Sequence, residues 1–179
     1  MDLTLQLNAR LRPNNREDLY EDKLDQQLKK QGIGECMGGG TMQLATGEIE
    51  YCDINVSIDD TCTALDTIQK ILKEIGVPKG SLLYNDEVYL PVGDLEGMAI
   101  YINGYDLPDA IYEECDINQV ITDINIRIEN VGSFYSYWEG PRETALYFYG
   151  SSFYNMKKQI QVFLKHHPLC QKCRIEQIA

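Results

Sequence analysis

The chain has 179 residues, of which 44% are apolar, and 28 acidic against 16 basic side chains give it a formal net charge of −12. This composition is typical of a folded protein with one core or two small ones, and it argues against a long disordered tail. The negative charge argues against direct binding of nucleic acid or of an anionic membrane surface, because both draw on Lys and Arg.

The sequence predicts a cytoplasmic protein. Its first residues, MDLT, lack the basic and apolar regions of a signal peptide, and no apolar run is long enough to cross a bilayer. The six cysteines are irregularly spaced, so we expect reduced, mostly buried thiols and no disulfide framework.

The first half of the chain predicts the order strand, helix, strand, strand, helix, strand. Leucines that alternate with polar residues indicate a half-buried first strand, and Asp60 or Thr61 can cap the second helix. The expected elements are a strand over 3–11, a helix over 16–31, strands over 36–44 and 48–58, a helix over 62–75, and a strand at 81–84 or at 88–90.

The second half predicts the same order again. Hydrophobic periodicity changes between that of a strand and that of a helix at similar intervals. The expected elements are a strand over 98–102, a long helix over 109–131, a hairpin with strands at 134–138 and 144–149, a helix over 151–165 and a last strand over 170–178.

Sequence landmarks support an internal duplication. The run LQLN at 5–8 with Pro13 matches IYIN at 100–103 with Pro108, at an offset of 95 positions. We therefore predict an α+β fold, a tandem duplication of a ferredoxin-like βαββαβ unit whose antiparallel sheets carry helices on one face. The units would cover 1–84 and 85–179, as two sheets or as one continuous globule.

The run ECMGGGTMQ at 35–43 has the glycines of a phosphate-binding loop but not its setting. Its glycines lie within a strand pattern, and no Gly-Lys-Ser/Thr ending follows them. The run therefore indicates a β-bulge or a close backbone approach. The second half carries FYSYW at the comparable point. This aromatic hairpin could pack on the glycines or flank a shared groove with them.

The run HHPLCQKC at 166–173 contains zinc-type ligands, His166, His167, Cys170 and Cys173. Residues three apart in a strand point to opposite faces, and no second Cys-x-x-Cys is present. We therefore expect a helix end followed by an ordinary last strand, and no metal site.

No catalytic residue or cofactor is predicted. Glu48 and Glu143 fall at the starts of the two third strands and could act as an acid and a base, but symmetry gives them similar surroundings. Asp53, inside an otherwise apolar strand, fits either an exposed face or a bulge. With no nucleophile beside a base, the sequence favours a non-enzymatic protein.

The strongest functional signal is an acidic central segment. Between Lys79 and Arg127 there are ten acidic residues and no Lys or Arg, and ten of the twelve tyrosines follow residue 83. Such charges can steer a basic partner, and Tyr and Trp supply buried anchors, although a solvated face and a half-exposed sheet would explain the same pattern. The candidate partner-binding residues are Asp86, Glu87, Asp94, Glu96, Asp106, Asp109, Glu113, Glu114, Asp116, Tyr105, Tyr112 and Trp138.

Several phrases, GEIEYCDI, GVPKGS, RETALYFYG and HPLCQKCRIEQIA, resemble those of a family of small acidic bacterial proteins, and this resemblance implies no activity. By generic analogy, acidic α+β proteins of this size are common among immunity proteins that neutralise basic toxin domains, often nucleases. Our leading hypothesis is such an inhibitor, which binds a basic protein. The alternatives are a small-molecule-binding protein or enzyme that uses a groove between the halves, and a homo-oligomer joined through sheet edges.

Overall fold

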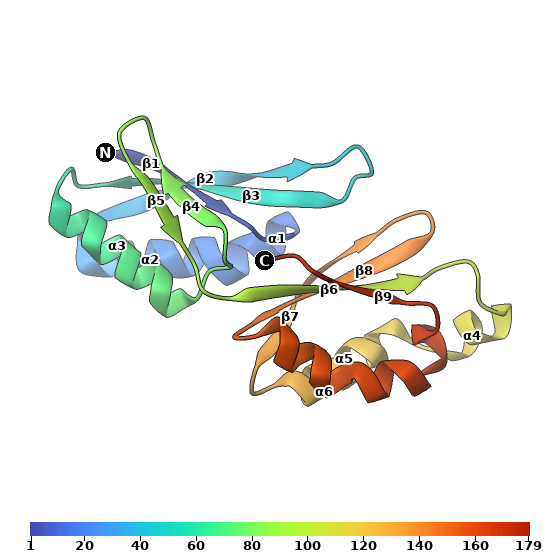
Figure 1. Ribbon diagram of the computed structural model, residues 1–179. Coiled ribbons are helices and arrows are strands. Elements are labelled where there is room, and N and C mark those ends of the chain that lie inside the picture. Colours follow the sequence, from blue (N-terminus) through green and yellow to red (C-terminus); the bar gives the residue numbers. More distant parts are fainter. The chain divides into compact units, whose positions relative to one another are not determined.

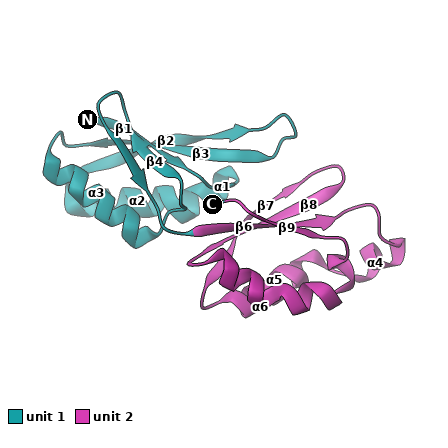
Figure 2. Cartoon of the chain, viewed as in Figure 1, with its two compact units in different colours: residues 1–95, 179 teal, residues 96–178 magenta.

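The computed structural model describes residues 1–179, which form two compact units (Figures 1 and 2). The first unit contains Met1–Leu95 together with Ala179, and the second contains Glu96–Ile178. We expected units over 1–84 and 85–179. The first unit instead extends to Leu95, eleven residues beyond the expected boundary.

The first unit is a five-stranded antiparallel sheet with strand order β2-β3-β1-β4-β5. The first strand ends at Leu7, earlier than expected, and both candidate fourth strands form, as a β4–β5 hairpin. Its elements are β1 (Asp2–Leu7), α1 (Pro13–Arg16), a π-helical turn (Glu17–Glu21), α2 (Asp22–Gln31), β2 (Gly34–Gln43), β3 (Ile49–Ile58), α3 (Cys62–Ile75), β4 (Ser81–Tyr84) and β5 (Tyr89–Val92).

The second unit is a four-stranded antiparallel sheet with strand order β7-β8-β6-β9. The long helix expected over 109–131 is in fact two helices, because Cys115 and Asp116 are extended and the Asp116 side chain caps the second one. The elements are β6 (Glu96–Asn103), α4 (Asp109–Glu114), α5 (Ile117–Ile128), β7 (Gly132–Glu139), β8 (Glu143–Gly150), α6 (Phe153–His166), a 3₁₀ turn (Pro168–Cys170) and β9 (Arg174–Gln177).

The strand order confirms the predicted fold class. In each unit the first and third strands are central, the second lies beside the third and the fourth beside the first, which is the order of a ferredoxin-like βαββαβ unit. Strand β5 is an addition at the edge of the first sheet. In Figure 1 the helices of each unit lie on one side of its own sheet.

The alternation along β1 sorts its side chains between two environments. Leu3, Leu5 and Leu7 are at most 3% exposed and face the helices, whereas the intervening polar residues lie on the other face of the sheet. Each such leucine contributes about 1.5–3 kcal/mol of hydrophobic stabilisation. Helix α3 closes this core with its buried Ile68 and Leu72, and the Thr61 side chain caps its N-terminus.

The two units share a β-bulge at the same place. In β2 the register against β3 shifts between Cys36 and Gly39, and in β7 the register against β8 shifts between Phe134 and Ser136. Each bulge sets two residues of the outer strand against one of the inner strand. The registers place Gly39 of the first unit where the second unit has Tyr137.

Each bulge is accompanied by a side-chain bond from the preceding helix to the strand edge. Asp25 Oδ1 on α2 accepts a hydrogen bond from Cys36 N at 3.0 Å, and Asn125 Oδ1 on α5 accepts one from Phe134 N at 2.7 Å. These bonds satisfy edge amides that would otherwise be open to another strand. The repeated device is independent structural support for the duplication.

The glycine run accommodates a half-buried ion pair against the strand. Gly38 has φ +94°, and a Cβ at Gly39 would lie 2.3 Å from the Asp53 carbonyl oxygen and 2.8 Å from Glu21 Oε1. Arg16 pairs with Glu21 there and donates to the Gly40 carbonyl oxygen at 3.0 Å. The bulge and close-approach interpretation is confirmed, and the glycine amides belong to a strand, not to a helix N-terminus.

We expect Gly39→Ala to destabilise the protein by about 1–3 kcal/mol or more, because the new methyl group must displace backbone that cannot retreat easily. Gly40→Ala is the matched control, since nothing lies within 4 Å of a Cβ there. Urea unfolding of both variants measures the difference; equal free energies of unfolding would contradict the close-approach explanation.

We expect Asn125→Ala to lower the free energy of unfolding by about 1 kcal/mol, because the Phe134 amide loses its acceptor. Asn125→Asp keeps an acceptor oxygen and should retain most of the stability. Thermal and urea unfolding of the two variants would show whether this edge bond has the proposed role, and a loss that is the same in both would speak against it.

Candidate functional site

The structure divides the predicted acidic segment between the two units. Asp86 and Glu87 lie in the β4–β5 turn and Asp94 follows β5, all in the first unit. The others belong to the second unit, and they are Glu96, Asp106, Asp109, Glu113, Glu114 and Asp116. The segment is therefore two acidic surfaces, one on each unit.

The β4–β5 turn is held by one asparagine. Asn85 Oδ1 accepts hydrogen bonds from Glu87 N at 2.9 Å and Val88 N at 2.7 Å, and Asn85 Nδ2 donates to the Asp2 carbonyl oxygen at 3.0 Å. This is the local bonding that makes Asn a favoured turn residue. The turn is thereby fixed to β1, and the carboxylates of Asp86 and Glu87 are left exposed.

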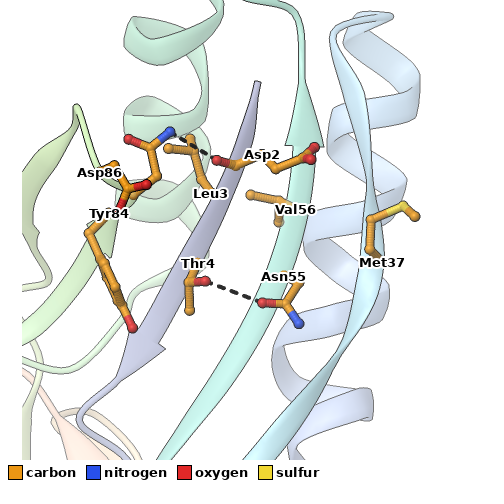
Figure 3. Close-up of a pocket in the computed structure, with 9 residues that line it drawn as sticks. Asp2, Leu3, Thr4, Met37, Asn55, Val56, Tyr84 and Asp86 are labelled. Carbon is orange, nitrogen blue, oxygen red and sulfur yellow. Dashed lines mark hydrogen bonds between the residues drawn. The ribbon is translucent and has the colours of Figure 1, made fainter.

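Beside this turn the open face of the first sheet has a hollow of about 510 Å³ (Figure 3). Figure 3 shows Tyr84 and Asp86 at one side of it and Met37 at the other, with Asp2, Thr4 and Asn55 between them. The lining residues come from four strands and the turn, and they are Asp2, Leu3, Thr4, Met37, Asn55, Val56, Tyr84, Asn85 and Asp86.

Hydrogen bonds fix the floor of this hollow. Thr4 Oγ1 donates to Asn55 Oδ1 at 3.2 Å, and Ser57 Oγ donates to Asp2 Oδ1 at 2.7 Å. All four groups lie on neighbouring strands, because Thr4 pairs with Asn55 and Asp2 with Ser57 in the β1–β3 ladder. The polar groups are therefore held in place by the sheet and do not depend on a mobile loop.

The charge of this sheet has one sign. Its five strands contain no Lys or Arg, and their ionisable acids are Asp2, Glu35, Glu50 and Asp53. Two cations from outside the strands lie at this end of the sheet: the N-terminal ammonium of Met1 donates to the Ile58 carbonyl oxygen at 2.6 Å, and Lys29 Nζ lies 3.8 Å from Glu35 Oε2. A negative concave face attracts cationic groups from solution.

Large apolar side chains border the polar face. Met37 is 64% exposed on β2, and Tyr89 is 72% exposed on β5, at the opposite edge of the sheet. Met42, also on β2, is exposed as well. Exposed Met and Tyr side chains around a polar centre are typical of surfaces that bind other proteins.

Asp53 lies near the middle of the same face, where the sequence allowed either an exposed acid or a bulge. It pairs with Gln6 on one side and with Gly40 on the other, so β2 supplies no side chain beside it. Burial raises the pKa of the Asp53 carboxyl, and Gln6 Nε2, at 3.5 Å, offsets this only partly. The Asp53 side chain therefore lies on the open face, and Asp53 pairs in the strand ladder with Gly40 of the glycine run.

The raised pKa predicts a definite pH dependence for Asp53→Asn. Because folding raises this pKa above its ordinary value of 3.8, the group favours the folded state below that value and loses this contribution as the pH rises through the folded pKa. Asp53→Asn should therefore be more stable than the wild type near neutral pH, and the difference should vanish below about pH 3.8. Urea unfolding across this range measures it, with Asp66→Asn on α3 as the control; a constant difference would contradict the burial explanation.

In the second unit several predicted partner-binding acids have structural roles. Glu96 Oε2 accepts from Phe153 N at 2.7 Å at the N-terminus of α6, and Asp116 Oδ1 accepts from Asn118 N at 2.8 Å at the start of α5. Asp106 forms an exposed ion pair with Lys172 at 2.7 Å. Asp109, Glu113 and Glu114 remain as exposed acids on α4.

The three aromatic candidates differ in their availability. Tyr105 is 57% exposed, with the Arg142 guanidinium 5.1 Å from its ring centre. The Tyr112 hydroxyl donates to Asn103 Oδ1 at 3.2 Å and accepts from Leu107 N at 3.1 Å, so it closes a loop. Trp138 is half-buried in β7, at the position of Gly40 in the first unit. Tyr105 has the most exposed ring of the three.

We expected Cys170 and Cys173 to lie in the last strand, but both precede β9 in the chain. They begin and end a tight turn in which Cys173 N donates to the Cys170 carbonyl oxygen at 3.2 Å and Lys172 has φ +61°. Burial raises the pKa of the Cys170 thiol to about 12, and burial also raises that of Cys173. No three His, Cys, Asp or Glu side chains have the geometry of a metal site. His166 Nδ1 lies 2.8 Å from the Val162 carbonyl oxygen, and the His167 ring packs on Phe163.

Glu48 and Glu143 are not equivalent in the two sheets. The ladder pairs Leu7 with Cys52 and Ile102 with Thr144, so the position of Glu143 corresponds to residue 51 and not to Glu48. Glu48 pairs with Arg10, and Glu143 pairs with Arg174 at 2.6 Å. Both carboxylates take part in ion pairs with an arginine.

Helices of the kind that cross a membrane, long and apolar over their whole length, do not occur in this structure.

No protein-family model matches the sequence, and no curated protein matches it. Among solved structures, the chain is similar to an unknown protein from Galdieria sulphuraria, with 13% identity, coverage of 98% of this chain and 96% of that one, and a TM-score of 0.30. It is also similar to the first two RRM domains of a yeast poly(U) binding protein, with 9% identity, coverage of 100% and 99%, and a TM-score of 0.28. A third is the regulatory subunit of aspartate kinase from Thermus thermophilus, with 13% identity, coverage of 90% and 91%, and a TM-score of 0.28. Similarities of this size give no indication of function.

Proposed function

We propose that this protein is a non-enzymatic binding protein for a basic protein partner, and that the open face of the first sheet is the contact surface. The observation that carries the proposal is the hollow beside the β4–β5 turn, in a sheet whose strands contain acids but no Lys or Arg. Charge complementarity of this kind raises association rates and selects partners by the sign of their charge.

The rim of the face supports a protein as the partner. Met37 and Tyr89 are exposed on opposite edges of the sheet, and both can be buried by a macromolecule that spans it. Protein interfaces combine such apolar anchors with a polar, wet surround. A small ion would use only the polar centre and would leave these side chains in water.

The most concrete form of the proposal is an immunity-type inhibitor of a basic toxin domain, such as a nuclease. A nuclease active site is built to bind a polyanion, and a fixed negative surface can occupy it. In the second unit, Asp109, Glu113 and Glu114 on α4 add a further acidic surface, which would steer the same partner during encounter.

We expect the double variant Asp86→Asn/Glu87→Gln to associate about tenfold more slowly with a cognate basic toxin domain at low salt, because it removes exposed charge beside the hollow. At high salt the difference should shrink, because screening weakens the attraction that the two carboxylates exert in the wild type and that the double variant lacks. Stopped-flow or biolayer association rates against a panel of purified basic nuclease domains, together with inhibition of their cleavage, provide the measurement.

The matched control is Glu17→Gln/Asp18→Asn, which makes the same change in net charge at exposed acids of the π-helical turn. Its association rate should stay close to that of the wild type. Equal slowing in both double variants would indicate that only net charge matters and would overturn the assignment of this face. Binding of no basic domain in the panel would overturn the proposed function itself.

A further inference from the structure

We infer that the hollow beside the β4–β5 turn is a subsite for the guanidinium group of an arginine side chain, so that the partner's central contact residue is an arginine and not a lysine. This inference rests on the proposed function, because it names the group through which a basic partner would engage the open face. All the residues that line the hollow belong to the first unit.

The arrangement of acceptors around the hollow favours a planar, forked donor. Carboxylates from two different segments line it, Asp2 on β1 and Asp86 in the β4–β5 turn, and the Asn55 amide lies on the strand between β1 and β2. A guanidinium presents five N–H donors in a fixed fork and can bond to separate acceptors at once. A lysine ammonium is a compact charge and would be satisfied by a single carboxylate and water.

The remaining lining suits the other surfaces of an arginine. Tyr84 stands beside Asp86 in Figure 3 and offers an aromatic ring, on which a guanidinium stacks better than an ammonium does. Met37, 64% exposed across the hollow, can cover the aliphatic stem of the same side chain. A volume of about 510 Å³ leaves room for the side chain together with a short stretch of its backbone.

The acceptors have capacity for an incoming cation. Asp2 Oδ1 accepts from Ser57, and Asn55 Oδ1 accepts from Thr4; both donors are neutral hydroxyl groups, so neither bond pairs the Asp2 carboxylate with a cation. Asp86 lies exposed in the turn, and no Lys or Arg belongs to the strands around it. A bound guanidinium would therefore be the first side-chain cation at this site.

The direct test is a titration of the ¹⁵N-labelled full chain with N-acetyl-arginine amide and, separately, with N-acetyl-lysine amide, followed by amide and side-chain NMR shifts. We expect millimolar binding of the arginine compound at the Asn55 and Asn85 side-chain amides, with an affinity at least about threefold above that of the lysine compound. Asp86→Asn should weaken arginine binding by about fivefold. Asp94→Asn makes the same charge change after β5 and should not.

A second variant separates stacking from charge. Tyr84→Leu leaves every carboxylate in place, so it should bring the two affinities to nearly equal values without abolishing binding. Equal binding of the two compounds by the wild type would overturn the arginine assignment and leave a basic partner as the proposed function. If the arginine compound does not shift the residues of the hollow, the subsite is overturned, whereas the proposed function is judged by the toxin-domain measurements described above.

Discussion

The separation of leucine from polar side chains along β1 is the constraint on which the first unit depends. Leu3, Leu5 and Leu7 must all reach the helices, so the residues between them must face away, and a shift of one residue would exchange the two sets. Helices cover only one face of this sheet. The other face is therefore left to the residues between the leucines, and the hollow and its carboxylates lie on that face.

The second constraint is the shared bulge with its bond from a helix to the edge strand. Asp25 and Asn125 differ in charge, and Cys36 and Phe134 differ in size, yet each pair makes the same bond beside the same register shift. The two units thus close the edge of the sheet in the same way, although the residues that form the bond are different in each unit. Once this edge is fixed, the second strand can be bare, as at Gly39, or crowded, as at Tyr137.

The order of elements was predictable because alternation, helical periodicity and caps are local signals. The break between α4 and α5 was missed because the apolar periodicity continues through Cys115 and Asp116, and only the capping bond of Asp116 reveals it. The equivalence of Glu48 and Glu143 was wrong because the strands of the two units align at different offsets, which a single offset cannot represent.

The candidate site was predictable only in part. The acidic segment pointed to Asp86 and Glu87, but Asp2, Asn55 and Met37 lie far from them in the sequence and join them only through strand pairing. Nothing in the sequence marks these three residues, since single polar and apolar residues on the outer face of a strand are common. The reason for the glycine run was equally hidden, because the Arg16–Glu21 pair that lies against it comes from another element.

The most direct test of a binding face on the first sheet is hydrogen–deuterium exchange of the chain alone and in complex with an inhibited basic toxin domain. The open-face assignment predicts new protection in β1 and in the β4–β5 turn, with little change in α2 and α3. Protection confined to the helices of the first unit, with β1 and the turn unchanged, would contradict it.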